Sequence, residues 1–175
     1  NYLSFGFLLD NLSALTLLVV TVITFLIQLY SYEYMKQEEG FQRYFVYLNL
    51  FNFSISGLII SPNLIQTYMF LVLTGVFSYL LYGFWHNKKS ASDLSKKIFS
   101  INFAADCLFL LGIVFILYFK ISYFQESKDS LLNFSSLYDL CQGIISYATD
   151  LGFGIICFVI ILGLALKSML FSFFT

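Results

Sequence analysis

The most constraining feature of this sequence is an uncharged stretch of 22 residues, LIQTYMFLVLTGVFSYLLYGFW, at Leu64–Trp85. At a rise of about 1.5 Å per residue, a helix of this length is roughly 33 Å long, close to the ~30 Å thickness of the hydrocarbon core of a bilayer. Tyr68, Tyr82 and Trp85 lie near its two ends, where amphipathic rings favour the membrane–water boundary. The stretch therefore predicts a membrane-spanning helix with no charge in its middle.

The composition of the whole chain agrees with a membrane protein. Only 11% of its 175 residues are charged and 59% are hydrophobic, whereas soluble domains carry about 25% charged residues. The net charge is −1, so no basic field suggests nucleic acid as a partner. The three cysteines form no CxxC pair and have no histidine at ligand spacing. We therefore expect no disulfide framework and no metal site.

Hydrophobic segments indicate a single all-α integral membrane domain, residues 1–175, with about five spans. The predicted spans are residues 12–30, 44–60, 64–85, 98–119 and 151–174. Apolar residues at helical spacing also predict an amphipathic helix at the membrane interface, at about residues 131–148. The polar run Glu33–Arg43 and the basic stretch His86–Lys97 are expected to be loops.

The second predicted span contains four polar residues, Asn49, Asn52, Ser54 and Ser56. Polar groups at this depth cannot face lipid without a free-energy cost. We therefore expect these side chains to point toward neighbouring helices, and the domain to depend on helix neighbours for its stability.

Lys167 is the leading candidate for chemistry. If the last span covers residues 151–174, this ammonium group lies inside the bilayer, where a charge is costly and usually marks a functional site. A basic group in that place would suit the uptake and release of protons. The alternative is that Lys167 extends its side chain to the membrane surface, because Leu151–Leu166 alone forms only about 24 Å of helix.

Three other ionisable residues lie within or beside the predicted spans. Asp106 lies within the fourth predicted span, where a carboxyl group needs a partner or a water-filled crevice, so it is either functional or a satisfied structural acid. Asp10 precedes the first span, and we expect it to cap that helix together with Asn11 and Ser13. His86 is expected to be a solvated loop residue rather than a proton relay.

Several stretches, taken together in order and spacing, resemble one family. They are FGFLLDNLSAL at Phe5–Leu15, LYSYEYM at Leu29–Met35, NLIQTYMF at Asn63–Phe70, GVFSYLLYGFW at Gly75–Trp85 and ALKS at Ala165–Ser168. The family is chain 5 of proton-pumping NADH:ubiquinone oxidoreductase (respiratory complex I), with the large antiporter-like subunit of the NADH-plastoquinone oxidoreductase of plastids and cyanobacteria. The resemblance implies that the chain corresponds to the third through seventh spans of a longer protein, as a fragment or a truncated, degenerate relative.

The resemblance implies a membrane-arm subunit of a complex I-type enzyme that takes part in proton transport. Electron transfer to ubiquinone would occur elsewhere in the complex, so the subunit would bind no redox cofactor. Its expected partners are the other membrane subunits and the lipid bilayer, and not nucleic acid. The expected location is the mitochondrial inner membrane, with a thylakoid or bacterial plasma membrane as alternatives. The alternative functions are a non-conducting structural subunit of the same complex and a fragment of an Mrp-type cation/proton antiporter.

The resemblance also carries over individual residues of the proton path. Lys167 matches the family's channel lysine, and Asn102 and Asp106 match the first and last residues of its Asn-Arg-x-Gly-Asp run. Phe103 and Ala105 replace the arginine and the glycine of that run. The resemblance therefore implies that Asp106 and Lys167 carry protons.

Val72 is the departure that bears most on function. The family has Phe-Trp-Glu-Leu-Val-Gly where this chain has FLVLTG at Phe70–Gly75, so Val72 stands where a proton-relaying glutamate is expected. Valine removes both a proton carrier and the polarity that holds water. The family also has Ser-Ala-Gln-Phe-Pro after the lysine, whereas Ser168–Ser172 contain no proline. We therefore expect this half-channel to be impaired.

Overall fold

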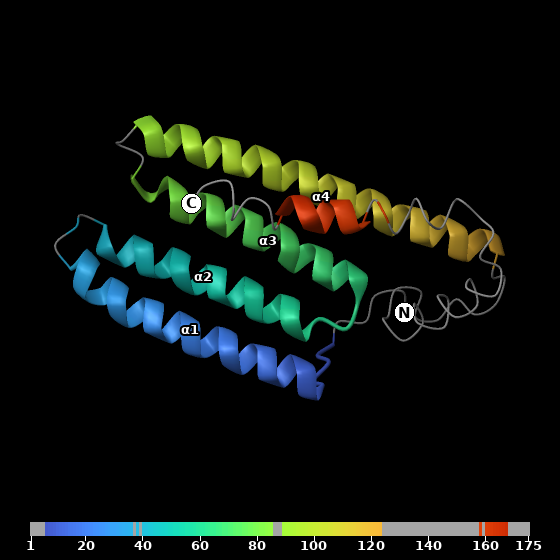
Figure 1. The fold of residues 1–175 in the computed structure, drawn as a ribbon, viewed down its shortest axis with the longest axis horizontal. Coiled ribbons are helices and arrows are strands. Elements are labelled where there is room, and N and C mark those ends of the chain that lie inside the picture. Colours follow the sequence, from blue (N-terminus) through green and yellow to red (C-terminus); the bar gives the residue numbers. More distant parts are fainter. Residues whose placement is uncertain are drawn as a thin grey trace. The chain divides into compact units, whose positions relative to one another are not determined.

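A computed structural model describes residues 6–36, 38, 40–85, 89–123, 158 and 160–167 of the chain. These residues form four long helices, α1 (Asn11–Met35), α2 (Phe41–Ile60), α3 (Leu64–Tyr82) and α4 (Lys89–Tyr123), and the short 3-10 helix η1 (Gly83–Trp85) (Figure 1). Residues 160–167 form a further helical segment. The part of the chain that the structure describes is therefore all-α, as predicted.

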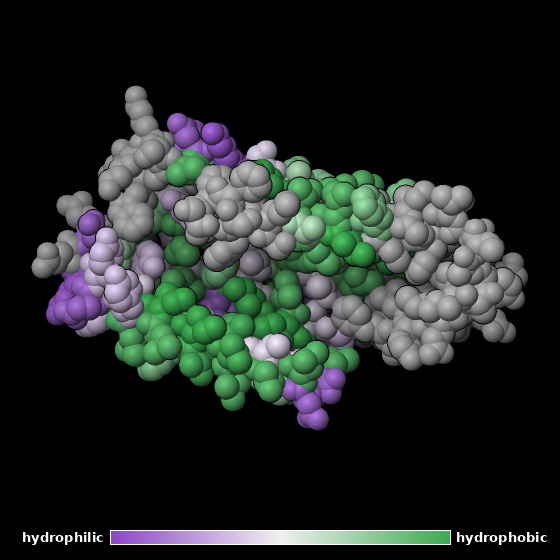
Figure 2. Space-filling view, viewed as in Figure 1, coloured by the Kyte–Doolittle hydropathy of each residue, from purple (hydrophilic) through white to green (hydrophobic). Residues whose placement is uncertain are grey.

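Among the described residues, three helices are long and apolar enough to cross a membrane: Asn11–Met35, Leu64–Tyr82 and Ser92–Tyr118. Large apolar side chains are exposed along the whole length of α1, among them Leu12, Leu15, Leu18, Val22 and Leu26. Figure 2 shows the visible face over α1 as largely hydrophobic, with hydrophilic residues toward the helix ends. Soluble monomers rarely expose an apolar surface of this extent. The chain is an all-α membrane protein.

Asp10 fixes the start of α1. Its carboxylate accepts a hydrogen bond from the Asn11 backbone N–H at 2.8 Å, and Ser13 Oγ accepts one from the Asp10 N–H at 2.7 Å. The Asp10 carboxylate also accepts a hydrogen bond from the Ser13 backbone N–H, so Asp10 and Ser13 form a capping box that satisfies backbone groups at the helix end. The predicted capping role of Asp10 and Ser13 is confirmed.

Polar side chains join α1 to α2. Three hydrogen bonds connect the two helices: Thr24 to Asn52 (3.2 Å), Gln28 to Asn49 (2.8 Å) and Ser31 to Tyr44 (3.2 Å). The α1 members of these pairs recur at helical spacing and so share one face. This confirms that Asn49 and Asn52 point toward a neighbouring helix. Because polar residues lower the apolar content of α2, it is not among the three apolar helices above, and its role as a span stays a prediction.

The contact between α2 and α3 combines a hydroxyl pair with a close approach at glycine. Ser54 is fully buried and accepts a hydrogen bond from Thr74 Oγ1 at 3.1 Å. Gly57 faces the ring of Phe70, where a methyl group would overlap the ring. The Phe70 ring in turn packs edge-on against Phe53, with centroids 6.0 Å apart. The two helices therefore approach closely because position 57 has no side chain.

The described residues divide into two compact parts. The first contains Phe7–Ser61 and Phe70–Phe99, and the second contains Gly6, Pro62–Met69 and the described residues from Ser100 onward. Within the second part, Gln66 Nε2 donates to the Gly6 carbonyl at 3.1 Å, and the Gly6 N–H donates to Gln66 Oε1 at 3.4 Å. This pair of hydrogen bonds ties the segment before α1 to the first turn of α3.

The helices extend further into the polar segments than hydropathy predicts. α1 continues past Tyr30 to Met35, and α2 begins at Phe41, so most of the predicted loop Glu33–Arg43 is helical. Gly40 turns the chain before α2 with a φ of 97°, a left-handed conformation that favours glycine. Hydropathy marks where a helix leaves hydrocarbon, whereas its backbone hydrogen bonds continue into water.

The same correction applies to α4. It begins at Lys89, so the predicted loop at His86–Lys97 was wrong over most of its length. Residues 90–97 of the predicted loop contain no glycine or proline that would stop a helix. The predicted interfacial helix at about residues 131–148, His86 and most of the predicted span 151–174 lie outside the described residues.

We predict that Gly57→Ala destabilises the α2–α3 contact. The added methyl group overlaps the Phe70 ring, which Phe53 already holds in place, and overpacking of this kind costs typically 1–3 kcal/mol. The measurement is the free energy of unfolding of the full-length protein in detergent, followed by loss of helical circular dichroism. Gly83→Ala is the matched control, because a Cβ there meets Ser95 at an ordinary 3.8 Å. Equal stability of the two variants would contradict the prediction.

Candidate functional site

One face of α4 is buried and carries polar groups at membrane depth. From Ser100 onward, the buried residues of α4 recur at helical spacing and are Asn102, Ala105, Asp106, Phe109, Gly112 and Ile113. This spacing defines a single stripe along the helix. The stripe belongs to the second compact part of the chain. It contains Asn102 and Asp106, the two α4 residues that the sequence analysis matched to the family pattern.

Lys167 and Asp106 form an ion pair. Lys167 Nζ donates to Asp106 Oδ1 at 2.7 Å, and the two side chains are 17% and 9% exposed. The two residues are 61 positions apart in the sequence, so the contact depends on the packing of residues 160–167 against α4. The structure thus brings together the two residues predicted to carry protons, and their role in proton transport stays a prediction.

Two stacked aromatic rings lie on the buried face of α4 that also carries Asp106. The Tyr68 ring, from the first turns of α3, stacks on the Phe109 ring with centroids 6.4 Å apart and an interplanar angle of 6°. Phe109 is buried and lies three residues, almost one turn, after Asp106. Low-polarity walls strengthen electrostatic interactions inside such a site, so these rings favour a tight ion pair.

Two glycines allow residues 160–167 to approach α4 closely. A Cβ atom on Gly163 would stand 3.2 Å from the Ala105 carbonyl oxygen and 3.3 Å from the Phe109 backbone nitrogen. A Cβ atom on Gly112 would overlap the side chain of Ile160. Small residues at helix crossings are typical of membrane proteins, because they let backbones approach.

An acid and a base in direct contact can exchange a proton. A proton transferred from the ammonium of Lys167 to the carboxylate of Asp106 leaves two neutral groups, and its return restores two charges. Outside water the charged and neutral forms are more nearly equal in free energy than they are in solution, because burial disfavours isolated charges. The pair is therefore suited to hold a proton and to release it when its surroundings change.

Val72 lies on α3 in the first compact part of the chain, where its side chain is half-buried. Thr74, two residues later, donates to the Phe70 carbonyl at 2.8 Å and to Ser54. A hydroxyl pair can orient water, but neither alcohol takes up or releases a proton near neutral pH. The polar group in this part of α3 is therefore Thr74, and position 72 carries no acid.

The other sequence candidates lie elsewhere. Asp10 is the cap of α1, as described above. His86 and Ser168–Ser172 lie outside the described residues. Within the part of the chain that the structure describes, no group of three or more His, Cys, Asp and Glu side chains gathers in a way that could hold a metal ion.

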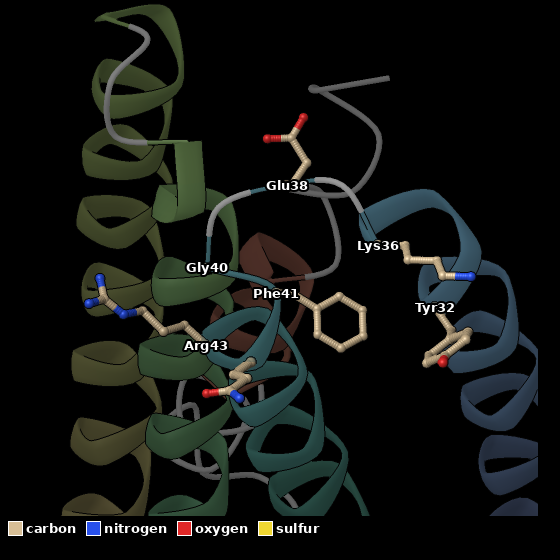
Figure 3. A pocket seen from close by; sticks show the side chains of 7 residues that line it. Tyr32, Lys36, Glu38, Gly40, Phe41 and Arg43 are labelled. Atoms are coloured by element: carbon tan, nitrogen blue, oxygen red, sulfur yellow. The ribbon is translucent and has the colours of Figure 1, made fainter.

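A hollow lies between the end of α1 and the start of α2, with a volume of about 430 Å³. Its lining residues are Tyr32, Lys36, Glu38, Gly40, Phe41, Gln42 and Arg43. Figure 3 shows the charged ends of Lys36 and Arg43 pointing in opposite directions, with the Phe41 ring between them. The cationic groups do not converge on a common point, so this hollow is not a built binding site.

Comparison with known sequences identifies the family. A profile described as NADH:quinone oxidoreductase/Mrp antiporter, TM, matches residues 61–175, about two thirds of the chain. A second profile, described as NADH-Ubiquinone oxidoreductase (complex I), chain 5 N-terminus, matches residues 2–45. The chain belongs to the NADH:quinone oxidoreductase/Mrp antiporter family of transmembrane proteins, as its chain 5 motifs predicted.

Its relatives include subunits of photosynthetic organisms. NAD(P)H-quinone oxidoreductase chain 5 of Synechocystis is 45% identical over 113 residues, which are 65% of this chain and 17% of the relative. The chloroplastic subunit 5 of Anthoceros angustus is 43% identical over 136 residues, 75% of this chain and 19% of the relative. The chloroplastic subunit 5 of Nephroselmis olivacea is 46% identical over 112 residues, which are 64% of this chain and 17% of the relative. The chain spans less than a fifth of the length of these relatives.

Sequence reasoning missed the packing residues of the site. Gly163 and Gly112 were not singled out, although Gly163 precedes Lys167 by one helical turn and a small residue at that spacing indicates close helix packing. Tyr68 was interpreted only as an interfacial ring, whereas the structure stacks it on Phe109. The partner of Lys167 could not be deduced, because sequence spacing does not reveal which helices are adjacent.

We predict strong coupling between Asp106 and Lys167 in stability. Asp106→Asn or Lys167→Gln alone should lower the free energy of unfolding by about 3–5 kcal/mol, because each leaves the opposite charge buried without its counter-ion. The double variant should lose much less than the sum, because no buried charge remains. The measurement is a double-mutant cycle on the full-length protein in detergent. Additive effects of the two substitutions would contradict the ion pair.

Proposed function

We propose that this chain forms part of an antiporter-like membrane subunit of a complex I-type NAD(P)H-quinone oxidoreductase, and that Asp106 and Lys167 carry protons in it. The observation that carries the proposal is the 2.7 Å contact between Lys167 Nζ and Asp106 Oδ1 on a buried helix face. Ionisable residues within membrane-spanning segments are rare and mark proton relays. Membership of the family supports the same assignment.

The proposed mechanism needs no redox centre in this chain. Electron transfer elsewhere in the assembly would change the field or the hydration around the pair, and the proton balance between Asp106 and Lys167 would change in response. When the pair separates, Lys167 releases a proton to one side of the membrane and takes one up from the other. The work of this subunit would thus be proton movement that is driven by a reaction at a distance.

A second candidate function is a non-conducting structural subunit of the same complex. The observation that favours it is Val72, which stands where the family resemblance implies a glutamate. A proton wire needs groups that exchange protons, or water between them, at each step. With valine at this step, the path through α3 would lack one carrier, and the half-channel would be impaired while Asp106 and Lys167 remain paired.

An Mrp-type cation/proton antiporter is the remaining alternative, since the description of the matching family includes it. The relatives reported above are named as subunits of NAD(P)H-quinone oxidoreductases, which supports the oxidoreductase. We accordingly propose the other membrane subunits of such a complex, and the surrounding lipid, as the partners of this chain.

The membrane in which the protein works is also a proposal. The mitochondrial inner membrane was expected, with a thylakoid or bacterial plasma membrane as alternatives. The relatives reported above come from a cyanobacterium and from chloroplasts. These sources support the thylakoid or bacterial alternative over the mitochondrial one.

Lys167→Met tests the function directly. In the assembled oxidoreductase, reconstituted in proteoliposomes, we expect fewer protons moved per NAD(P)H oxidised, because methionine cannot take up a proton. The amount of assembled complex and its electron-transfer rate serve as controls for folding. An unchanged proton-to-electron ratio in fully assembled complex would contradict proton transport by this pair and leave the structural function.

Val72→Glu is the converse variant in the same preparation. If the missing acid limits this half-channel, glutamate at position 72 should raise the proton-to-electron ratio or the passive proton leak. Val72→Gln is its matched control, because it adds a polar side chain of similar size that does not titrate. Equal effects of the two substitutions would show that polarity, and not a proton carrier, is what position 72 lacks.

A further inference from the structure

Gly163 occupies the position that sets how closely residues 160–167 approach α4. It is buried, and it lies four residues, about one helical turn, before Lys167, so the two share a helix face. The atoms nearest to its missing side chain are the Ala105 carbonyl oxygen and the Phe109 backbone nitrogen. These two residues flank Asp106 on α4. Gly163 therefore packs against the stretch of backbone that carries the acid.

We propose that Gly163 is a positioning residue for the Asp106–Lys167 pair. Because Gly163 has no side chain, the two backbones lie close enough for Lys167 Nζ to reach Asp106 Oδ1 at 2.7 Å. A side chain at this position pushes the segment away from α4 and lengthens the reach that Lys167 must make. The effect of a side chain at position 163 on the Asp106–Lys167 contact follows from geometry. Only the effect of such a side chain on proton transport rests on the proposed function.

The kind of atom that each glycine meets distinguishes Gly163 from Gly112. A Cβ atom on Gly112 would overlap the Ile160 side chain, which a smaller residue at position 160 relieves. A Cβ atom on Gly163 meets backbone atoms at 3.2 and 3.3 Å, which no side-chain substitution removes. The two positions lie on the same interface. Comparing them separates crowding against a side chain, which a second substitution can relieve, from crowding against backbone, which it cannot.

The contact between Lys167 and Asp106 should weaken further as the side chain at position 163 becomes larger. Alanine at position 163 requires a shift of a few tenths of an ångström, which the flexible lysine can partly follow. Leucine requires a larger shift, beyond what lysine rotamers recover. A carboxylate that is one methylene longer, in Asp106→Glu, reaches toward the displaced ammonium and should restore the contact after Gly163→Ala.

The test measures the coupling between positions 106 and 167 in four backgrounds of the full-length protein. The coupling is the difference between the Tm change of the Asp106→Asn/Lys167→Gln double variant and the sum of the single changes. We expect the coupling to fall stepwise from the parent to Gly163→Ala to Gly163→Leu. We expect it to recover in Gly163→Ala/Asp106→Glu, where the cycle starts from glutamate, and not aspartate, at position 106.

Two controls separate positioning from general packing. Gly112→Ala/Ile160→Ala alters the same interface without crowding the backbone and should keep the parent coupling. Leu164→Phe adds bulk at a neighbouring side chain that is 46% exposed and should also keep it. A lower Tm with unchanged coupling in Gly163→Leu overturns the proposal, as does a failure of Asp106→Glu to restore coupling after Gly163→Ala. Should Gly163→Leu not fold, the Gly163→Ala pair of variants decides.

Proton transport is measured in parallel in the assembled oxidoreductase. Loss of coupling in Gly163→Ala with a lower proton-to-electron ratio, both regained with Asp106→Glu, supports positioning and transport together. If Gly163→Leu loses the coupling while Gly163→Leu and Lys167→Met both move protons like the parent, the proposed function is overturned and the positioning role remains. A lower ratio in Lys167→Met, together with parent-like coupling and transport in Gly163→Leu, overturns the positioning role alone.

Discussion

The cost of placing a charge in hydrocarbon is the constraint on which the rest of the structure depends. A charge on Asp106 or on Lys167 alone would be costly at membrane depth, and the 2.7 Å contact between the two residues offsets part of that cost. The contact also determines which helices must be neighbours, since the two residues are far apart in the sequence. The buried stripe of α4 and the small residue at position 163 are consequences of that requirement.

The same physics explains the other helix contacts. Lipid tails are as apolar as leucine, so no hydrophobic force drives helices together within a bilayer. Hydrogen bonds and close packing take its place. Gln28 and Asn49 join α1 to α2, and Ser54 with Gly57 joins α2 to α3. This is why polar residues within apolar stretches, and glycines beside rings, carry more information here than the leucines around them.

Much of the fold could be predicted from the sequence, because the bilayer fixes how long an apolar helix must be. An apolar helix at Leu64–Trp85 and the cap at Asp10 follow from local patterns. The structure has the cap, and it has the helix α3 there, which ends at Tyr82 and is followed by the 3-10 helix Gly83–Trp85. The helix ends could not be predicted in the same way. α4 begins at Lys89 because helical hydrogen bonding does not stop where hydrocarbon does.

The residues of the candidate site could be predicted from the sequence, but the contact between them could not. Lys167 and Asp106 were recognisable one by one, as ionisable groups where a charge is costly and as matches to a family pattern. Their contact depends on how helices distant in the sequence pack, which no local pattern encodes. Gly163 was missed for the same reason: a glycine in a helix is informative only when the backbone facing it is known.

The most direct test of proton transport by Asp106 and Lys167 uses the double variant Asp106→Asn/Lys167→Gln in the assembled oxidoreductase. Removing both charges keeps the interface free of an unpaired buried ion, so assembly and electron transfer should be retained. The measurement is the number of protons moved per NAD(P)H oxidised in proteoliposomes. If the pair carries protons, that ratio falls below the parent value. A parent-like ratio in fully assembled complex would contradict a role for the pair in proton transport.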